Sequence, residues 1–164
     1  MGESLKQTVQ LPDAAATEQL GRRLASGLPR DSSGWIVLLQ GELGSGKSTL
    51  ARALLHALGH QGPVPSPTYT LVEPYEIGDR SIYHVDLYRI ADEGELPFLG
   101  WAELREGLML VEWPERAPAL LDQADLHIRL SFLDAGENGD GGDGREAVLQ
   151  ACSDRAALLL RKLN

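Results

Sequence analysis

Two hydrophobic patterns alternate along the chain. Nearly continuous apolar runs occur at residues 35–40 (WIVLLQ) and 108–113 (LMLVEW). Such runs are typical of strands buried on both faces, as in a parallel sheet. Apolar residues at helical spacing occupy residues 14–27, after the N-cap residue Asp13, and recur over residues 47–58. The chain therefore alternates interior strands with amphipathic helices.

Further strands and one further helix are predicted by alternating or helical patterns and by turn residues. We expect an edge strand at 5–11, two strands at 70–77 and 81–88 joined by a turn at Gly78-Asp79, a strand with one buried face at 124–133, a returning strand at 145–153, and a closing amphipathic helix at 154–164. Since no repeat or domain break interrupts this order, we expect a single domain over residues 1–164.

Four segments have less regular patterns. Residues 92–107 are predicted to be helical in two pieces, interrupted near Pro97 and Gly100. The other three segments are a proline-rich loop at 63–68, a short helix or turn at 114–121, and a stretch at 135–144 with several acidic residues and five glycines. We interpret residues 135–144 as a mobile acidic hairpin tip rather than a calcium loop, because the spacing of an EF-hand is missing.

Composition limits the possible functions. The 164 residues are 43% hydrophobic, which is enough for a core, and carry a formal net charge of −9. This charge argues against a wide nucleic-acid-binding surface and against docking on an anionic membrane. Cys152, the single cysteine, is interpreted as a small buried apolar residue and not as a nucleophile. Without a signal-peptide pattern or an apolar run of about 18 residues, we expect a soluble cytoplasmic protein.

The stretch GELGSGKST, residues 41–49, matches the P-loop pattern between a predicted strand and a predicted helix. Its glycines allow backbone N–H groups to point at phosphate oxygens, and the helix adds its positive dipole end. Lys47 reaches the β- and γ-phosphates, and the hydroxyl of Ser48 is the expected Mg²⁺ ligand. The expected nucleotide-binding residues are Gly41, Glu42, Leu43, Gly44, Ser45, Gly46, Lys47, Ser48 and Thr49.

A P-loop NTPase also needs an acidic residue near the metal ion. Asp86 ends the apolar run IYHVD and Glu112 ends LMLVE, so both are candidates to hold Mg²⁺ or to polarise the attacking water. Proteins that read guanine carry an N/TKxD motif, and neither Asn138 nor Asn164, the only asparagines, belongs to one. ATP is therefore favoured by elimination.

Four more short stretches follow the P-loop in a recognisable order. They are SPTYTLVEPY (66–75), YHVDLYRI (83–90), FLGWAEL (98–104) and LVEWPERA (110–117). Together with GELGSGKSTL, this order resembles the TsaE (YjeE) family, the P-loop ATPase of bacterial tRNA threonylcarbamoyladenosine (t6A) synthesis. The resemblance runs from about residue 11 to residue 133.

The resemblance implies an α/β fold: a single P-loop NTPase domain with a mixed, mostly parallel sheet flanked by helices. It implies binding of ATP and Mg²⁺, slow ATP hydrolysis by the protein alone, and action with the partner proteins TsaB and TsaD. TsaD would transfer threonylcarbamoyl to adenosine 37 of tRNAs that read ANN codons. This protein would meet tRNA only indirectly, through the complex.

The resemblance also implies roles for single residues. Ser66 and Thr68 would lie in a loop resembling a switch I, close to the γ-phosphate. Asp86 would serve the metal, and Glu112 the metal or the attacking water. The predicted catalytic residues are Lys47, Thr68, Asp86 and Glu112, and the predicted metal ligands are Ser48, Asp86 and Glu112. From its spacing, His84 should share a sheet face with Asp86, and a hydrogen-bonded packing role is favoured for it.

Two other functions remain open at this point. A small-molecule P-loop kinase would need an acceptor pocket and usually a lid with arginines, but the segment 92–107 contains only Arg105. A nucleotide-gated binding module with negligible turnover would use Asp86 and Glu112 to hold Mg·ATP. Its SPTYT loop would then report the bound nucleotide to a partner.

Overall fold

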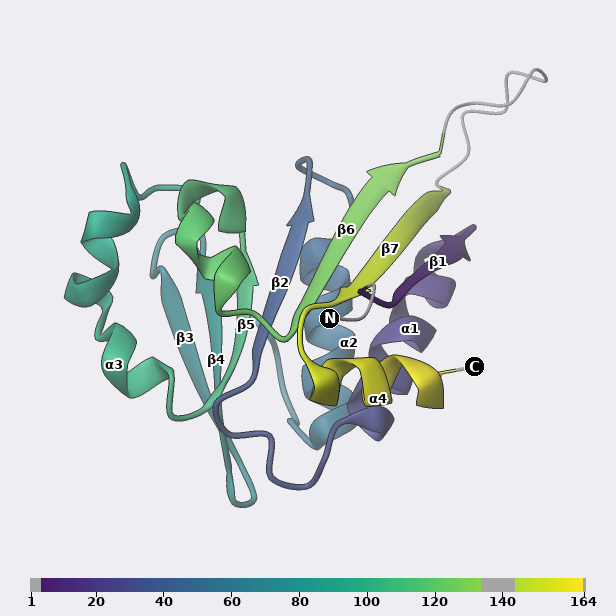
Figure 1. Cartoon of the computed structure of the whole chain (residues 1–164), viewed down its shortest axis with the longest axis horizontal. Helices are drawn as coiled ribbons and strands as arrows, with labels where there is room; N and C mark the ends of the chain where they lie inside the picture. The colour runs from purple at the N-terminus through teal and green to yellow at the C-terminus, as the bar shows by residue number, and fades with distance from the viewer. Residues whose placement is uncertain (1–3, 134–143, 164) are drawn as a thin grey trace.

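The computed structural model describes residues 4–133 and 144–163 as one α/β unit built on a seven-stranded sheet (Figure 1). The strands are β1 (Lys6–Leu11), β2 (Ile36–Gly41), β3 (Val72–Ile77), β4 (Arg80–Asp86), β5 (Leu108–Glu112), β6 (Leu126–Phe132) and β7 (Arg145–Ala151). The α-helices are α1 (Ala14–Gly27), α2 (Lys47–Leu58), α3 (Trp101–Leu104) and α4 (Asp154–Lys162). Three 3₁₀ helices accompany them: η1 (Glu93–Leu99), η2 (Pro114–Arg116) and η3 (Pro118–Asp122).

The order of the strands across the sheet is β1-β7-β6-β2-β5-β4-β3. The central pairs β4–β5, β5–β2 and β2–β6 are parallel, whereas β3–β4, β6–β7 and β7–β1 are antiparallel. Only β3 and β7 therefore run against the other five strands. The predicted mixed, mostly parallel sheet is confirmed, and β1 is the predicted edge strand.

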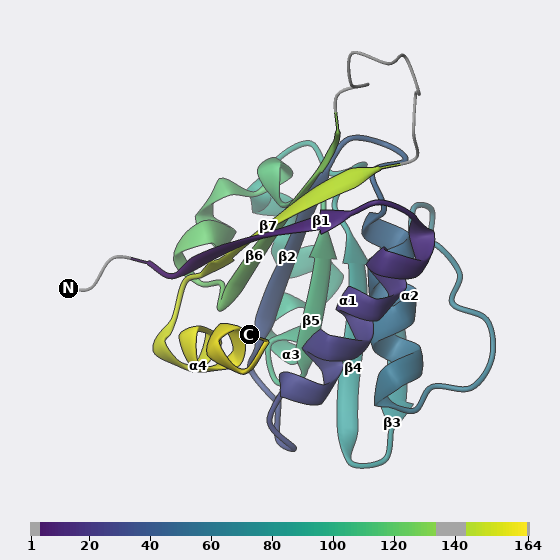
Figure 2. The ribbon, with the colours of Figure 1, turned by 90° about the vertical axis from the view of Figure 1, so that its right-hand side faces the viewer.

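Helices cover both faces of the sheet and form two hydrophobic cores. One core joins α1, α2 and α4 to the sheet, and the other joins η1, α3 and η3 to the opposite face. Figure 2 shows α1 and α2 side by side on one side of the strands. The predicted interior strands β2 and β5 lie at the centre, where every residue of β5 is buried. This explains their continuous apolar runs.

The topology brings the candidate chemistry to one end of the sheet. Because β2, β4 and β5 are parallel, their carboxyl ends meet at the same edge. The P-loop leaves the end of β2 and leads directly into α2, while Asp86 and Glu112 are the last residues of β4 and β5 and are Cα partners across the sheet. The fold thus places the phosphate-binding motif beside both predicted acids.

Three sequence predictions are corrected by the structure. Pro97 does not interrupt the helical segment but lies inside η1, and it is Gly100, with a φ of 76°, that separates η1 from α3. The strand β6 has buried residues on both faces at its start, since it lies between β2 and β7. Cys152 is exposed and not buried. The predicted hairpin tip at 135–144, apart from Gly144, lies outside the described residues.

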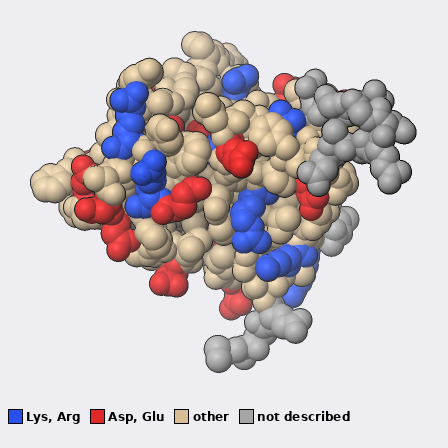
Figure 3. Space-filling model, turned by 90° about the horizontal axis from the view of Figure 1, so that it is seen from above, with Lys and Arg blue, Asp and Glu red and all other residues tan. Residues whose placement is uncertain are grey.

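Charged groups of both signs are spread over the end of the molecule at which the parallel strands finish (Figure 3). In this view Lys and Arg side chains are interspersed with Asp and Glu side chains. Within residues 4–133 and 144–163, the structure contains no helix that is both long and apolar enough to cross a membrane.

Candidate nucleotide-binding site

A cavity of about 200 Å³ lies beside the P-loop at the carboxyl end of the sheet. Its lining combines the P-loop from Leu43 to Thr49 with Thr68, Asp86 and Glu112, and adds Ser66 and Trp113. The fold therefore brings together all of the predicted catalytic and metal-binding residues. Of the predicted nucleotide-binding residues, only Gly41 and Glu42 lie outside this lining, at the start of the loop.

The glycines of the P-loop are required by space and by backbone conformation. A Cβ at Gly41 would lie 2.3 Å from the Ser45 hydroxyl oxygen and 2.6 Å from the Leu130 carbonyl oxygen. Gly44 and Gly46 have φ angles of 80° and 108°, which side-chain-bearing residues rarely adopt. Because Gly46 has no side chain to cap α2, the first N–H groups of the helix remain available. Such a cradle fits phosphate oxygens.

Lys47 is the first residue of α2, directly after the P-loop glycines, and its side chain is 5% exposed. Its Nζ donates to the carbonyl of Gly41, lies 3.4 Å from the carbonyl oxygen of Glu42, and lies 3.8 Å from the centroid of the Trp113 ring. Burial lowers the pKa of Lys47, and the negative charges of Glu112, Glu115 and Asp86 oppose that shift. A cation that is partly shielded from water, next to backbone N–H groups without a capping side chain, is suited to bind phosphate, because electrostatic attraction is stronger at a lower dielectric constant.

The two predicted acids are buried and face hydroxyl groups. Asp86 and Glu112 are each 3% exposed. The Ser48 hydroxyl lies 3.4 Å from Oε1 of Glu112, and the Thr68 hydroxyl lies 3.4 Å from Oδ2 of Asp86. Burial raises the pKa of Asp86, a backbone hydrogen bond from Tyr88 lowers it, and the charge of Glu112 raises it further. Two carboxylates and a hydroxyl are oxygen ligands of the kind that Mg²⁺ prefers, so this donor set fits the predicted metal ion.

Two non-glycine residues with left-handed backbone flank these acids. Leu71 has a φ of 68°, and its carbonyl accepts a hydrogen bond of 2.9 Å from the backbone N–H of Asp86. Trp113 has a φ of 58° and follows Glu112 directly. Such conformations cost about 1–3 kcal/mol each and cluster at functional sites. Here each one turns the chain next to a buried carboxylate.

His84, Arg89 and Tyr69 belong to the stretches YHVDLYRI and SPTYTLVEPY, which also contain Asp86 and Thr68. His84 is hydrogen-bonded and shares the face of Asp86, as predicted: its Nε2 lies 2.5 Å from Oε2 of Glu112. The Arg89 guanidinium lies 4.3 Å from the centroid of the Tyr69 ring. Tyr69 itself is 81% exposed.

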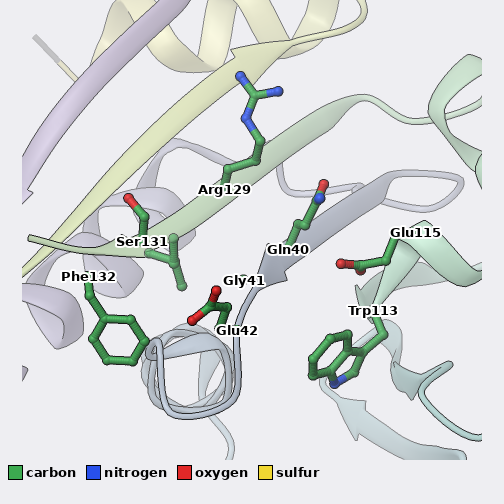
Figure 4. A pocket seen from close by; sticks show the side chains of 9 residues that line it. Gln40, Gly41, Glu42, Trp113, Glu115, Arg129, Ser131 and Phe132 are labelled. Carbon is green, nitrogen blue, oxygen red and sulfur yellow. The ribbon is translucent and has the colours of Figure 1, made fainter.

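A second, larger cavity of about 480 Å³ adjoins the P-loop. Figure 4 shows Trp113 and Glu115 on one side of it and Arg129, Ser131 and Phe132 of β6 on the other. Nothing in the sequence marked this cavity, because it depends on β6 packing beside β2. The same holds for Arg145, which donates to the Gly44 carbonyl over 3.2 Å and so braces the P-loop from β7.

A strand, a glycine-rich loop with its lysine and serine, and a helix define the P-loop class of phosphate-binding folds. Within that class, the chain belongs to the family described as "Threonylcarbamoyl adenosine biosynthesis protein TsaE", whose model matches residues 11–138. The family takes part in tRNA threonylcarbamoyladenosine biosynthesis.

Individual relatives agree with this assignment. The tRNA threonylcarbamoyladenosine biosynthesis protein TsaE of Haemophilus influenzae is 41% identical over 140 residues, which cover 83% of this chain and 87% of that protein. The Synechocystis protein of the same name is 44% identical over 118 residues, which cover 69% of this chain and 73% of that protein. The crystal structure of Bacillus subtilis YdiB superposes with a TM-score of 0.75 over 99% of this chain and 97% of that one, at 24% identity, and so shares the fold.

Proposed function

We propose that this protein binds ATP with Mg²⁺ in the cavity beside the P-loop and hydrolyses it to ADP and phosphate. The main support for this proposal is that one cavity at the first turn of α2 is lined by all four residues: Lys47, Ser48, Asp86 and Glu112. ATP is preferred to GTP because the sequence lacks the N/TKxD motif that reads guanine.

Each residue has a physical task in this reaction. The Lys47 ammonium and the P-loop N–H groups hold the phosphates and stabilise the negative charge that shifts toward the leaving ADP. Ser48 and Asp86 would hold Mg²⁺, which would neutralise negative charge on the phosphate groups. Glu112 would either join them or orient the water that attacks the γ-phosphorus. Thr68 lines the same cavity and would contact the γ-phosphate.

The biological role follows from the family. We propose that hydrolysis supports t6A formation at adenosine 37 of ANN-decoding tRNAs in the cytoplasm, together with TsaB and TsaD, and that tRNA is met only through that complex. Hydrolysis is expected to be slow alone and faster with the partners.

The test is a reconstituted t6A reaction that contains TsaB, TsaD and tRNA. Addition of this protein with ATP should raise multiple-turnover formation of t6A, whereas the Lys47→Ala variant should not. A yield that is indifferent to this protein would overturn the assigned role. A phosphorylated small molecule formed at the expense of ATP would instead favour a kinase.

A nucleotide-gated binding module is supported by one specific contact. Thr68 links the carboxylate of Asp86 to a loop whose next residue, Tyr69, is 81% exposed. A change at the metal site can therefore be transmitted to the surface. Single-turnover assays with and without TsaB and TsaD separate the two functions, because a gate changes partner affinity on nucleotide binding without appreciable ADP formation.

A further inference from the structure

One buried contact at the site is used by none of the roles proposed so far. His84 is 1% exposed, and its Nε2 is 2.5 Å from Oε2 of Glu112. Both side chains project from the sheet face that is covered by α2, because the Cα partner of His84 is Leu110, two residues before Glu112 on the same face of β5. His84 does not line the P-loop cavity, whereas Glu112 does.

The two oxygens of Glu112 have different partners. Oε2 is held by His84, while Oε1 lies 3.4 Å from the hydroxyl of Ser48. The last torsion of a glutamate side chain is soft and prefers no single orientation strongly. A short hydrogen bond to one oxygen from a rigid, buried ring removes that freedom. It therefore determines where the other oxygen points.

The hydrogen-bonding pattern of the ring supports a donor role for Nε2. The Nδ1 atom of His84 is buried and has no hydrogen-bond partner among the described residues. A proton on Nδ1 would bury an unpaired N–H donor, whereas a proton on Nε2 has the Glu112 carboxylate as its acceptor. The tautomer is assigned from these contacts, as is usual for histidine.

We propose that His84 is a positioning residue, which donates its Nε2–H to Oε2 of Glu112 and so holds Oε1 toward the Ser48 side of the cavity. This inference rests on the proposed ATPase function and deepens it. It makes the orientation of the Glu112 carboxylate, and not only its presence, a requirement for hydrolysis. Partners that orient the groups around a metal site in this way are commonly worth ~10- to 100-fold in activity.

Three single variants test the proposal by single-turnover ATP hydrolysis. His84→Phe keeps a ring and removes the donor, so we expect its rate to fall ~10- to 100-fold, with Mg²⁺-free ATP affinity unchanged within about 2-fold. His84→Gln can place an amide N–H near the position of Nε2 and should recover most of the rate. His127→Phe is the matched control, because His127 is also buried in the sheet but is hydrogen-bonded to Gln40, 2.7 Å away. This control should hydrolyse ATP at the wild-type rate.

Combination with Glu112→Gln shows whether His84 acts through Glu112. If it does, His84→Phe should lower the rate in the wild-type background and have no further effect in the Glu112→Gln background. The proposal is overturned by equal losses in both backgrounds, or by a His84→Gln variant as slow as His84→Phe. Thermal unfolding of each variant shows whether loss of the fold explains a slow rate, and His84→Gln serves as the folded test if His84→Phe unfolds.

NMR distinguishes failure of this proposal from failure of the ATPase function. In ¹⁵N-histidine-labelled protein, the Nε2–H proton of His84 should resonate far downfield, and Glu112→Gln should move this resonance upfield. If the wild-type protein hydrolyses no ATP, the proposed ATPase function is wrong. The hydrogen bond from His84 to Glu112 is then tested by the Nε2–H resonance alone. An imidazole resonance that Glu112→Gln leaves unchanged would then overturn the positioning role.

Discussion

At the scale of the residue, Lys47 is a charged side chain in a buried position. Its ammonium group is almost fully buried, and it is held by P-loop carbonyls and by the face of Trp113. Burial alone disfavours this charge, which is why the pKa of Lys47 is lowered. The negative charges of Glu112, Glu115 and Asp86 offset part of this effect, and a bound triphosphate would add negative charge next to the ammonium group. A buried ammonium group in this position is consistent with the proposed binding of phosphate.

Lys47→Ala should therefore weaken binding of ATP about 10- to 100-fold, because a charge-assisted hydrogen bond contributes about 1.5–3 kcal/mol. Isothermal titration of Mg·ATP measures this change. Lys6→Ala on the exposed edge strand is the control, since it removes the same charge far from the cavity. Equal affinities of the Lys47→Ala variant and the wild type would exclude Lys47 as a phosphate ligand.

The positions of single site residues could be predicted only where they follow from a motif or from the end of an apolar strand. Lys47 and Ser48 belong to a motif, and Asp86 and Glu112 end apolar strands, so the cavity that unites them was expected. The larger cavity and the brace from Arg145 to Gly44 arise from the packing of β6 and β7, which no local pattern encodes. The exposure of Cys152 was missed because it is the first residue after β7, and the prediction had extended the strand through it.

At the scale of the element, the P-loop depends on a glycine with no space for a side chain. Gly41→Ala would place Cβ against the Leu130 backbone oxygen, which cannot move without shifting β6. We expect this variant to lose most ATP binding and to unfold at lower denaturant concentration than the wild type. Titration with ATP and urea unfolding measure the two effects.

Gly78→Ala is the matched control. Gly78 has a φ of 60° in the β3–β4 turn, with nothing within 4 Å of a built Cβ. The strained backbone should cost about 1–2 kcal/mol of stability, and ATP affinity should stay at the wild-type value. A Gly41→Ala variant that bound ATP normally would contradict the tight approach of the P-loop to β6.

A second element-scale prediction concerns Asp125, which ties β2 and α4 together. It accepts hydrogen bonds from the Ile36 N–H at 3.0 Å, the Ser153 hydroxyl at 2.8 Å and the Arg155 guanidinium at 2.7 Å. Burial raises the pKa of Asp125, but these hydrogen bonds outweigh burial and hold the pKa below its usual value. Asp125→Asn should lower the free energy of unfolding by about 1–3 kcal/mol near neutral pH.

The sign of the pH dependence follows from the lowered pKa. A depressed carboxyl stabilises the fold fully above its ordinary pKa of 3.8, and that contribution is lost as the pH falls through the lower folded-state value. The difference between wild type and Asp125→Asn in urea unfolding should therefore narrow on acidification. A constant difference from neutral pH to pH values below 3.8 would show that the charge of Asp125 is not responsible.

Element types were predictable along most of the chain, because interior strands and amphipathic helices have different periods. The segment at 92–107 was predicted less well. Pro97 was expected to interrupt the helix, but η1 is a 3₁₀ helix capped by Asp92 and Glu95 and accommodates the proline. Similarly, the burial of β6 on both faces depends on its neighbours in the sheet, which the sequence of the strand alone does not name.

At the scale of the whole molecule, we propose that partner proteins control the ATPase activity of the site. The exposed SPTYT loop and the buried acids are joined through Thr68 and Asp86, so a protein docked at the loop can alter the geometry around the γ-phosphate. The partners that we propose are TsaB and TsaD. In the proposed reaction, Lys47 binds phosphate and Glu112 holds the metal ion or orients the attacking water.

The most direct test is the ATP hydrolysis rate of the wild type, Lys47→Ala and Glu112→Gln, each measured alone and with TsaB–TsaD. We predict slow hydrolysis by the wild type alone, a clear rise with the partners, and a large fall of both rates to a residual level in the two variants. Fast hydrolysis that is indifferent to TsaB–TsaD, or a partner-stimulated rate that survives in both variants, would contradict the account.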